Sequence, residues 1–249
     1  MRSLSLLWLL LGAPAALAED AATKPTIEEL LDRTDDINRG DSSTAVMAME
    51  VKTDRYERSM KMRAKSKGEE KSLIVILEPA KDAGISTLKV DDNLWNYMPK
   101  VDRTMKVPAG MMSGSWMGSH LSNDDLVRNS RLRDDFTYTM TEEPAADGTG
   151  QWVIELVPKP DAPVVWGKVV VNIRPDQIPK KIEYFDEKGA LVRTLAFDDV
   201  QDIDGRKVPM TMSVIPGDKP GEYTKLVYEE LTFSVDHDDN TFSLQALKK

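Results

Sequence analysis

Apolar and polar residues alternate with a period of two along much of this chain, and the alternation predicts β-strands. Between residues 44 and 52 one strand face carries small or apolar side chains, while the other carries mostly polar ones. In residues 56–65, Met60 and Met62 share one face and Lys61 lies on the other. Each of these strands is therefore expected to have one buried face and one face in water.

The same reading extends to the rest of the chain, where strands are separated by turn residues at regular spacing. The further predicted strands are 73–77, 85–90, 94–98, 136–142, 152–157, 164–174, 180–185, 191–197, 208–215 and 223–233. A parallel design would need a helix between most strands, and the pattern predicts few helices. We therefore expect about ten strands in one strongly curved antiparallel sheet or open barrel.

Two helices are predicted. Thr26 and Glu29 form a capping box directly after Pro25, and apolar residues at helical spacing follow until Gly40. Residues 73–77 are apolar on both faces, so this strand should be covered on both sides, with the first helix as the expected cover. A second, short helix is expected from Ser122 to about Arg131.

Residues 107–123, VPAGMMSGSWMGSHLSN, contain no charged side chain although 30% of the chain is charged. The segment is too short and too rich in glycine to span a membrane as a helix, which takes about 20 apolar residues. Long loops of this kind often cover binding sites. We call residues 107–123 the lid segment and predict that it covers an apolar site. The expected cover residues are Met111, Met112, Trp116 and Met117, and the expected hinges are Gly110, Gly114 and Gly118.

Methionines occur in pairs two residues apart on three predicted strands, so both members of each pair face the same side of the sheet. The pairs are Met47/Met49, Met60/Met62 and Met210/Met212. Flexible thioether side chains adapt to irregular apolar ligands, and these residues are predicted to line a ligand cavity. Two alternatives remain at this point. The methionines could be ordinary core residues, or they could bind Cu(I), which prefers soft ligands.

Residues 1–18 have the pattern of a secretory signal, with Arg2, an apolar centre and the small-residue site Ala16-Leu17-Ala18. The expected organisation is a signal peptide at 1–18 and one domain at 19–249. With 33 basic and 42 acidic residues the net charge is −9, which argues against nucleic acid and anionic membrane surfaces as partners. There is no cysteine, hence no disulfide and no site for a lipid anchor.

No catalytic motif is present. The two histidines, His120 and His237, lack the spacing of a zinc site, and no nucleophile motif accompanies them. His120 is expected to be a polar lid residue and His237 a solvated turn residue in the acidic run 236–239. We therefore predict no enzyme activity, no cofactor and no metal.

Several motifs resemble those of the exported LolA-like proteins, the outer-membrane lipoprotein-sorting family, in the subgroup associated with RND/MMPL-type exporters. The motifs are Leu77-Glu78-Pro79-Ala80 through Gly84, Leu94-Trp95-Asn96-Tyr97-Met98-Pro99, Arg103, Ser115-Trp116-Met117-Gly118-Ser119 and Asp124-Asp125-Leu126. The resemblance covers nearly the whole mature chain. It implies an unclosed antiparallel β-barrel with an N-terminal helix, a short helical lid and an apolar cavity for acyl chains. Trp95 and Met98 of the second motif are added to the predicted cavity lining.

The resulting hypothesis is a soluble, monomeric periplasmic carrier. It would bind a lipid or a lipoprotein acyl chain and pass it between an inner-membrane RND/MMPL-type transporter and the outer membrane. The alternative is an accessory or adaptor domain of such an exporter, whose barrel is filled by its own side chains.

Overall fold

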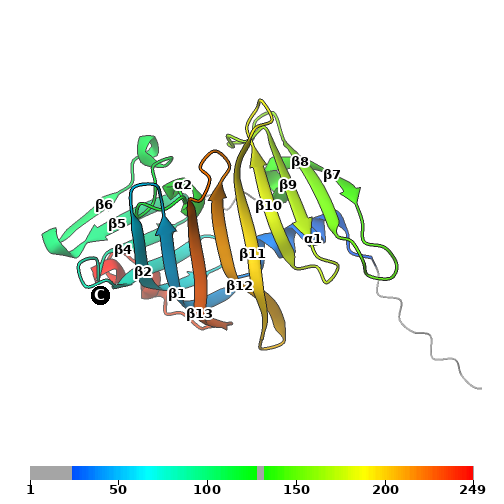
Figure 1. Cartoon of the computed structure of the whole chain (residues 1–249). Helices are drawn as coiled ribbons and strands as arrows, with labels where there is room; N and C mark the ends of the chain where they lie inside the picture. The colour runs from blue at the N-terminus through cyan, green and yellow to red at the C-terminus, as the bar shows by residue number, and fades with distance from the viewer. Residues whose placement is uncertain (1–23, 128–131, 249) are drawn as a thin grey trace, which may run out of the picture.

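The computed structural model describes residues 24–127 and 132–248, and its strands form a single sheet (Figure 1). The strands are β1 (Ser42–Lys52), β2 (Glu57–Lys67), β3 (Lys71–Glu78), β4 (Ser86–Val90), β5 (Asn93–Met98), β6 (Arg103–Lys106), β7 (Phe136–Glu142), β8 (Trp152–Pro158), β9 (Lys168–Ile173), β10 (Pro179–Phe185), β11 (Leu191–Ile203), β12 (Arg206–Pro216) and β13 (Tyr223–Phe233). The helices are α1 (Ile27–Asp36), α2 (Asn123–Val127) and α3 (Leu132–Asp135), with 3₁₀ turns η1 (Pro99–Val101), η2 (Ala109–Met111), η3 (Asp239–Phe242) and η4 (Ala246–Lys248). In these two ranges no helix has the length and apolar character needed to cross a membrane.

The sheet is antiparallel throughout and does not close. Its order is β6-β5-β4-β3-β2-β1-β13-β12-β11-β10-β9-β8-β7, so β6 and β7 are its two edges. The first strand pairs with the last, from Ser43 opposite Phe233 to Lys52 opposite Tyr223. This pairing joins the two halves of the sheet at its centre. The predicted fold class, mainly β with an unclosed antiparallel sheet, is confirmed.

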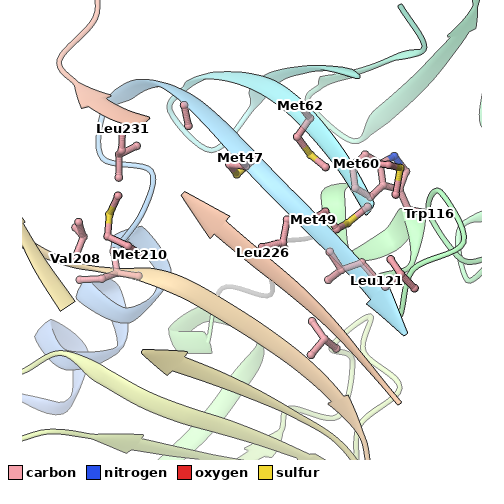
Figure 2. Close-up of a cluster of buried hydrophobic side chains, with 14 of the residues drawn as sticks. Met47, Met49, Met60, Met62, Trp116, Leu121, Val208, Met210, Leu226 and Leu231 are labelled. Atoms are coloured by element: carbon pink, nitrogen blue, oxygen red, sulfur yellow. The ribbon is translucent and has the colours of Figure 1, made fainter. Parts of the chain in front are cut away.

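The alternation predicted for the central strands is also confirmed, and the register adds a feature that the sequence alone does not show. Met60 of β2 lies opposite Met49 of β1, Met49 lies opposite Leu226 of β13, and Leu226 lies opposite Met212 of β12. A second row joins Met62, Met47 and Tyr228 in the same way. Neighbouring strands therefore present continuous rows of apolar side chains on one face (Figure 2).

Helix α1 begins as predicted. Thr26 Oγ1 accepts the amide of Glu29, and the Glu29 carboxylate accepts the amide of Thr26, which completes the capping box. Leu30 and Leu31 are buried against the β8–β10 half of the sheet. The helix thus packs on the opposite half of the sheet from β3, and the expectation that it covers residues 73–77 is wrong.

The C-terminal segment covers that strand instead. Phe242 and Leu247 pack against Leu73 of β3 and Leu88 of β4 in a separate apolar cluster. His237, expected in a solvated turn, is buried, and its Nε2 lies 2.9 Å from the carbonyl oxygen of Ser43. His237 is buried because the acidic run around it leads into an apolar segment that returns to the sheet.

Three features of the secondary structure also differ from the prediction. The described residues form thirteen strands rather than about ten, because all twelve predicted segments contain a strand and the short strand β6 adds an edge. Strand β9 begins at Lys168, not at 164, and Val165 before it is 79% exposed. The second predicted helix is limited to α2 among the described residues, while residues 128–131 of the prediction, like the signal peptide at 1–18, lie outside them.

Leu247→Ala should lower the free energy of unfolding by about 2–5 kcal/mol, because it removes a fully buried side chain from the C-terminal cluster. Leu244→Ala is the matched control: Leu244 is 49% exposed, and its loss should change stability by no more than about 0.5 kcal/mol. Urea unfolding of both variants measures the difference. Equal effects would show that the C-terminal segment does not hold the outer face of β3 and β4.

Candidate functional site

A cavity of about 370 Å³ lies between the sheet, the end of α1 and the segment that leads into α2. Its volume is within the range of about 300–1,000 Å³ that is typical of small-molecule sites. Figure 1 shows α1 and α2 behind the sheet, on the side where this cavity is found. The cavity reaches the surface beside the exposed Gly68, in the turn between β2 and β3.

The strands supply an apolar wall because their inward positions belong to the two rows described above. Met47, Met62 and Met212 line the cavity, and the remaining apolar lining residues are Ile37, Ala45, Ala64, Ile74, Trp116, Leu121, Leu126, Ile182, Leu195, Phe197 and Leu226. Methionine side chains can adjust to different apolar shapes. The wall is therefore suited to a flexible hydrocarbon chain.

The lid segment forms part of the opposite wall. Trp116 is only 3% exposed, and its Nε1 donates a hydrogen bond to Thr87 Oγ1 at 3.1 Å. The Trp116 amide donates to the carbonyl of Leu121, and an isolated bridge joins Ser115 to Ser122. The segment is thus folded back on itself, with Trp116 and Leu121 pointing into the apolar cluster (Figure 2).

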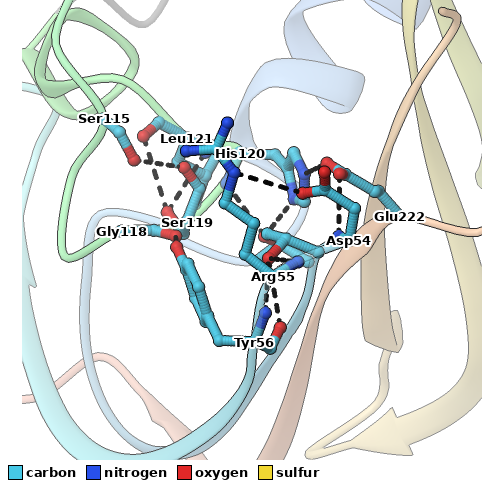
Figure 3. A network of polar contacts seen from close by, with 11 residues as sticks. Asp54, Arg55, Tyr56, Ser115, Gly118, Ser119, His120, Leu121 and Glu222 are labelled. Atoms are coloured by element: carbon cyan, nitrogen blue, oxygen red, sulfur yellow. Dashed lines mark hydrogen bonds and ion pairs between the residues drawn. The ribbon is translucent and has the colours of Figure 1, made fainter. Parts of the chain in front are cut away.

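Polar contacts hold the middle of the lid segment to neighbouring strands (Figure 3). The hydroxyl of Tyr56 donates to the carbonyl of Gly118, while His120 Nε2 lies 3.0 Å from a Glu222 oxygen and its Nδ1 lies 2.9 Å from Thr224 Oγ1. The hydrogen bond with His120 lowers the pKa of the Glu222 carboxyl. Thr224 is completely buried, so this arrangement does not present a nucleophile to a substrate.

One ion pair crosses the cavity wall. Arg193 of β11 makes a two-pronged contact with Asp125 of α2, at 2.8 Å from Nη1 to Oδ2 and 2.7 Å from Nη2 to Oδ1. The amide and the hydroxyl of Ser122 also donate to Asp125 Oδ2, at 2.8 and 2.9 Å. Burial acts to raise the pKa of Asp125, but the hydrogen bonds and charge of Arg193 outweigh it and hold that pKa below its usual value.

At the end of α1 the cavity wall carries titratable side chains whose pKa values are raised by burial. Asp35 lines the cavity, and its Oδ2 accepts the amide of Leu132 at 3.1 Å. Burial raises the pKa of Asp35 to about 8. Tyr228 lines the same cavity, and burial raises the pKa of its hydroxyl to about 12.

The predicted site residues are thus divided. Met47, Met62, Met212 and Trp116 come together in the cavity wall, and Met49, Met60, Met210 and Met117 pack in the same apolar cluster behind it. The others lie elsewhere: Trp95 packs with the C-terminal cluster, Met98 is half-buried at the end of β5, Met112 lines a separate open pocket, and Met111 is 62% exposed. Binding by any of these residues remains a prediction.

The predicted hinge glycines differ in their surroundings. Gly110 has nothing within 4 Å of an added Cβ, and Gly114 would meet the carbonyl oxygen of Met111 at 3.1 Å. Gly118 has a φ of +75°, which favours glycine, and Tyr56 Oη would lie 3.0 Å from its Cβ. Whether they act as hinges remains a prediction.

Sequence reasoning missed several lining residues. Leu195 and Phe197 alternate on β11, and Leu226 and Tyr228 alternate on β13, so the period-two signal was available for both pairs. For Arg193 and Asp125 no such signal exists, because only the fold brings them together. Among the residues that the structure describes, no cluster of three or more His, Asp or Glu side chains could hold a metal ion.

Comparison with known proteins places the chain in a family. The sequence profile of a family described as "uncharacterized protein" matches residues 68–249. The chain belongs to this family. None of the curated proteins matches it.

Solved structures of similar proteins cover nearly the whole chain. A DUF1329 family protein from Desulfovibrio piger is 26% identical, with a TM-score of 0.77 over 88% of this chain and 97% of that one. A putative outer membrane lipoprotein-sorting protein domain from Vibrio parahaemolyticus has a TM-score of 0.74 at 24% identity, over 89% and 98% of the two chains. A LolA superfamily protein from Nitrosomonas europaea has a TM-score of 0.72 at 24% identity, over 90% and 100%. The fold is therefore LolA-like.

The raised pKa of Asp35 generates a prediction about pH. A carboxyl that holds its proton more tightly in the folded state than in the unfolded state stabilises the fold at low pH, and this contribution is lost as pH rises from about 4 towards 8. Stability should therefore decline across this window, and Asp35→Asn should remove the decline, because the amide carries no titrating proton. Urea unfolding at several pH values measures both slopes, and identical slopes would mean that Asp35 titrates normally.

Proposed function

We propose that the protein is an exported carrier that shields the acyl chain of a lipid or lipoprotein in its cavity. In this proposal the carrier works in the periplasm and passes its cargo from an inner-membrane exporter of the RND/MMPL type to the outer membrane. The observation that carries the proposal is the apolar cavity between the methionine rows and the lid segment. The LolA-like fold and the lipoprotein-sorting relative support it.

The burial of an acyl chain can supply the binding free energy that a carrier needs, without a catalytic step. Each buried CH₂ group contributes about 0.8 kcal/mol, so several methylenes of an acyl chain give useful affinity. These methylenes would contact the apolar side chains that line the cavity. No nucleophile, metal cluster or open polar cleft is needed, and we propose no enzymatic step.

One observation favours the alternative of an adaptor that carries nothing. Trp116 is buried in the apolar cluster and hydrogen-bonded to Thr87, as expected for a side chain that fills its own barrel. In the carrier, Trp116 occupies this place only while the cavity is empty. The two proposals therefore differ in what the lid segment does when an apolar molecule is added.

A charge in the methionine rows should prevent binding. Met62→Asp places a carboxylate at a fully buried position, and Met212→Asp places one on the cavity wall. Both variants should lose the binding of the uncharged apolar dye N-phenyl-1-naphthylamine, measured by its fluorescence. Lys61→Asp should bind as the wild type does, because Lys61 lies on the other face, where it pairs with the exposed Glu229.

Loss of binding could also reflect unfolding, so a second variant is needed. Met212→Trp adds apolar volume inside the cavity and should exclude the dye while the circular dichroism spectrum stays native. Full dye binding by folded Met212→Trp would show that the dye binds somewhere else.

Hydrogen exchange separates carrier from adaptor. The amides of Trp116, Asn123 and Asp124 are bonded within the lid region, to the carbonyls of Leu121, Gly114 and Met112. When the cavity is loaded with dodecanol, these amides should exchange faster, while the amides of β1 and β13 should not change. Trp116→Ala should weaken dodecanol retention more than it lowers the melting temperature. The adaptor predicts unchanged exchange and a loss of about 3–5 kcal/mol of stability in Trp116→Ala.

A further inference from the structure

The ion pair in the cavity wall joins a rigid element to the lid region. Arg193 lies near the start of β11, a thirteen-residue strand, and is paired there with Pro216 of β12. Its guanidinium lies 4.6 Å from the ring centroid of Tyr184 and 4.8 Å from that of Trp166. These contacts do not involve the lid segment, so Arg193 stays in place when the lid segment moves.

Its partner Asp125 belongs to the other wall. It lies in α2, the short helix that directly follows the lid segment, and Ser122 of the lid segment donates two hydrogen bonds to it. Both Asp125 and Arg193 line the cavity, together with Leu126 beside them. A ligand that displaces the lid segment would therefore separate a carboxylate from a buried guanidinium.

That separation has a consequence for the ligand. The side chain of Arg193 is 13% exposed, and a buried charge without a partner is strongly unfavourable. Its Nε, also shielded from water, has no hydrogen-bond acceptor among the described residues. A carboxylate or phosphate on the ligand would restore the lost charge pair and could also accept from Nε. A hydroxyl could accept a hydrogen bond but carries no compensating charge, and an ammonium group could not accept one at all.

We propose that the cargo is an amphiphile with one acyl chain and an anionic head, and that this head binds Arg193 in place of Asp125. In the empty protein the Asp125 carboxylate stands where the head of the ligand binds. The methionine rows hold the chain. This inference rests on the proposed carrier function and names the class of its cargo.

The test compares ligands that share a chain and differ only in the head. Laurate, dodecyl phosphate, dodecanol and dodecylammonium are titrated into the wild-type protein by isothermal calorimetry, together with inorganic phosphate as a head without a chain. Laurate and dodecyl phosphate should bind at least about tenfold more tightly than dodecanol, which corresponds to about 1.4 kcal/mol. Dodecylammonium should bind most weakly, and inorganic phosphate alone should not bind measurably, since the chain supplies most of the affinity.

Arg193→Gln should reduce the preference for laurate over dodecanol to about one, while the affinity for dodecanol is kept. Arg103→Gln is the matched control, because Arg103 is exposed on β6 and outside the cavity, and it should keep the full preference. Asp125→Asn removes the carboxylate that competes with the ligand. It should bind laurate several-fold more tightly than the wild type, and laurate should raise its melting temperature more than it raises that of the wild type.

Arg193→Gln could fail to fold because it leaves Asp125 buried without a partner. The double variant Asp125→Asn, Arg193→Gln removes both charges and should fold, bind dodecanol and show no preference for laurate. Equal binding of laurate and dodecanol by the wild type, or a preference that survives in the double variant, would overturn the anionic head while leaving the carrier in place. If the wild type binds none of the four amphiphiles, the carrier function fails and this inference fails with it.

Discussion

The pairing of β1 with β13 is the interaction on which the rest of the structure depends. It runs along almost the whole of both strands and places the first strand beside the last. Without it, the β1–β6 half and the β7–β13 half would be separate sheets with open edges. Met49 meets Leu226 across this pair, so the same pairing makes one apolar row continuous from β2 to β12, and Leu226 and Met212 of this row line the cavity.

Beside its apolar wall the cavity is lined by charged residues, among them Arg39, Lys65, Glu69 and Lys71, and its two aspartates, Asp125 and Asp35, are compensated differently. Arg193 and Asp125 neutralise each other through a two-pronged contact, so both stay ionised. At Asp35, burial outweighs the hydrogen bond from the Leu132 amide and the charge of Arg39, so the carboxyl holds its proton, with a pKa of about 8. A loaded cavity would need to keep the same balance, which is why the charge of the ligand follows from the residues around it.

Local patterns were enough to predict the fold class and a few residues of the cavity wall. The two-residue period placed Met47, Met62 and Met212 on the inner face before any register was known. It could not show that β1 lies beside β13, because these strands are far apart in the sequence and their faces fit several partners. For the same reason Arg193 was not recognised: in its own strand it is an ordinary polar residue, and only the folded chain brings it to Asp125.

The residues that lie away from their expected places do so for equally local reasons. Trp95 and Met98 belong to a motif near the lid segment, but Trp95 contacts Leu73 and Leu88 of the outer cluster because it faces the other side of the sheet from the cavity. His237 sits in an acidic run typical of a turn, yet the apolar residues after it, Phe242 and Leu247, draw the segment onto the sheet. The composition of a short stretch of sequence does not predict contacts with residues that are far away along the chain.

The central claim is that the cavity holds one acyl chain of a lipid or lipoprotein. Native mass spectrometry of the protein purified from the cells that make it, without detergent, tests this most directly. A carrier should give a second species at one-to-one stoichiometry, heavier than the unliganded protein by the mass of one acyl-bearing molecule. Met212→Trp should lack this second species. Only the bare mass from the wild type, or the same bound mass in Met212→Trp, would contradict it.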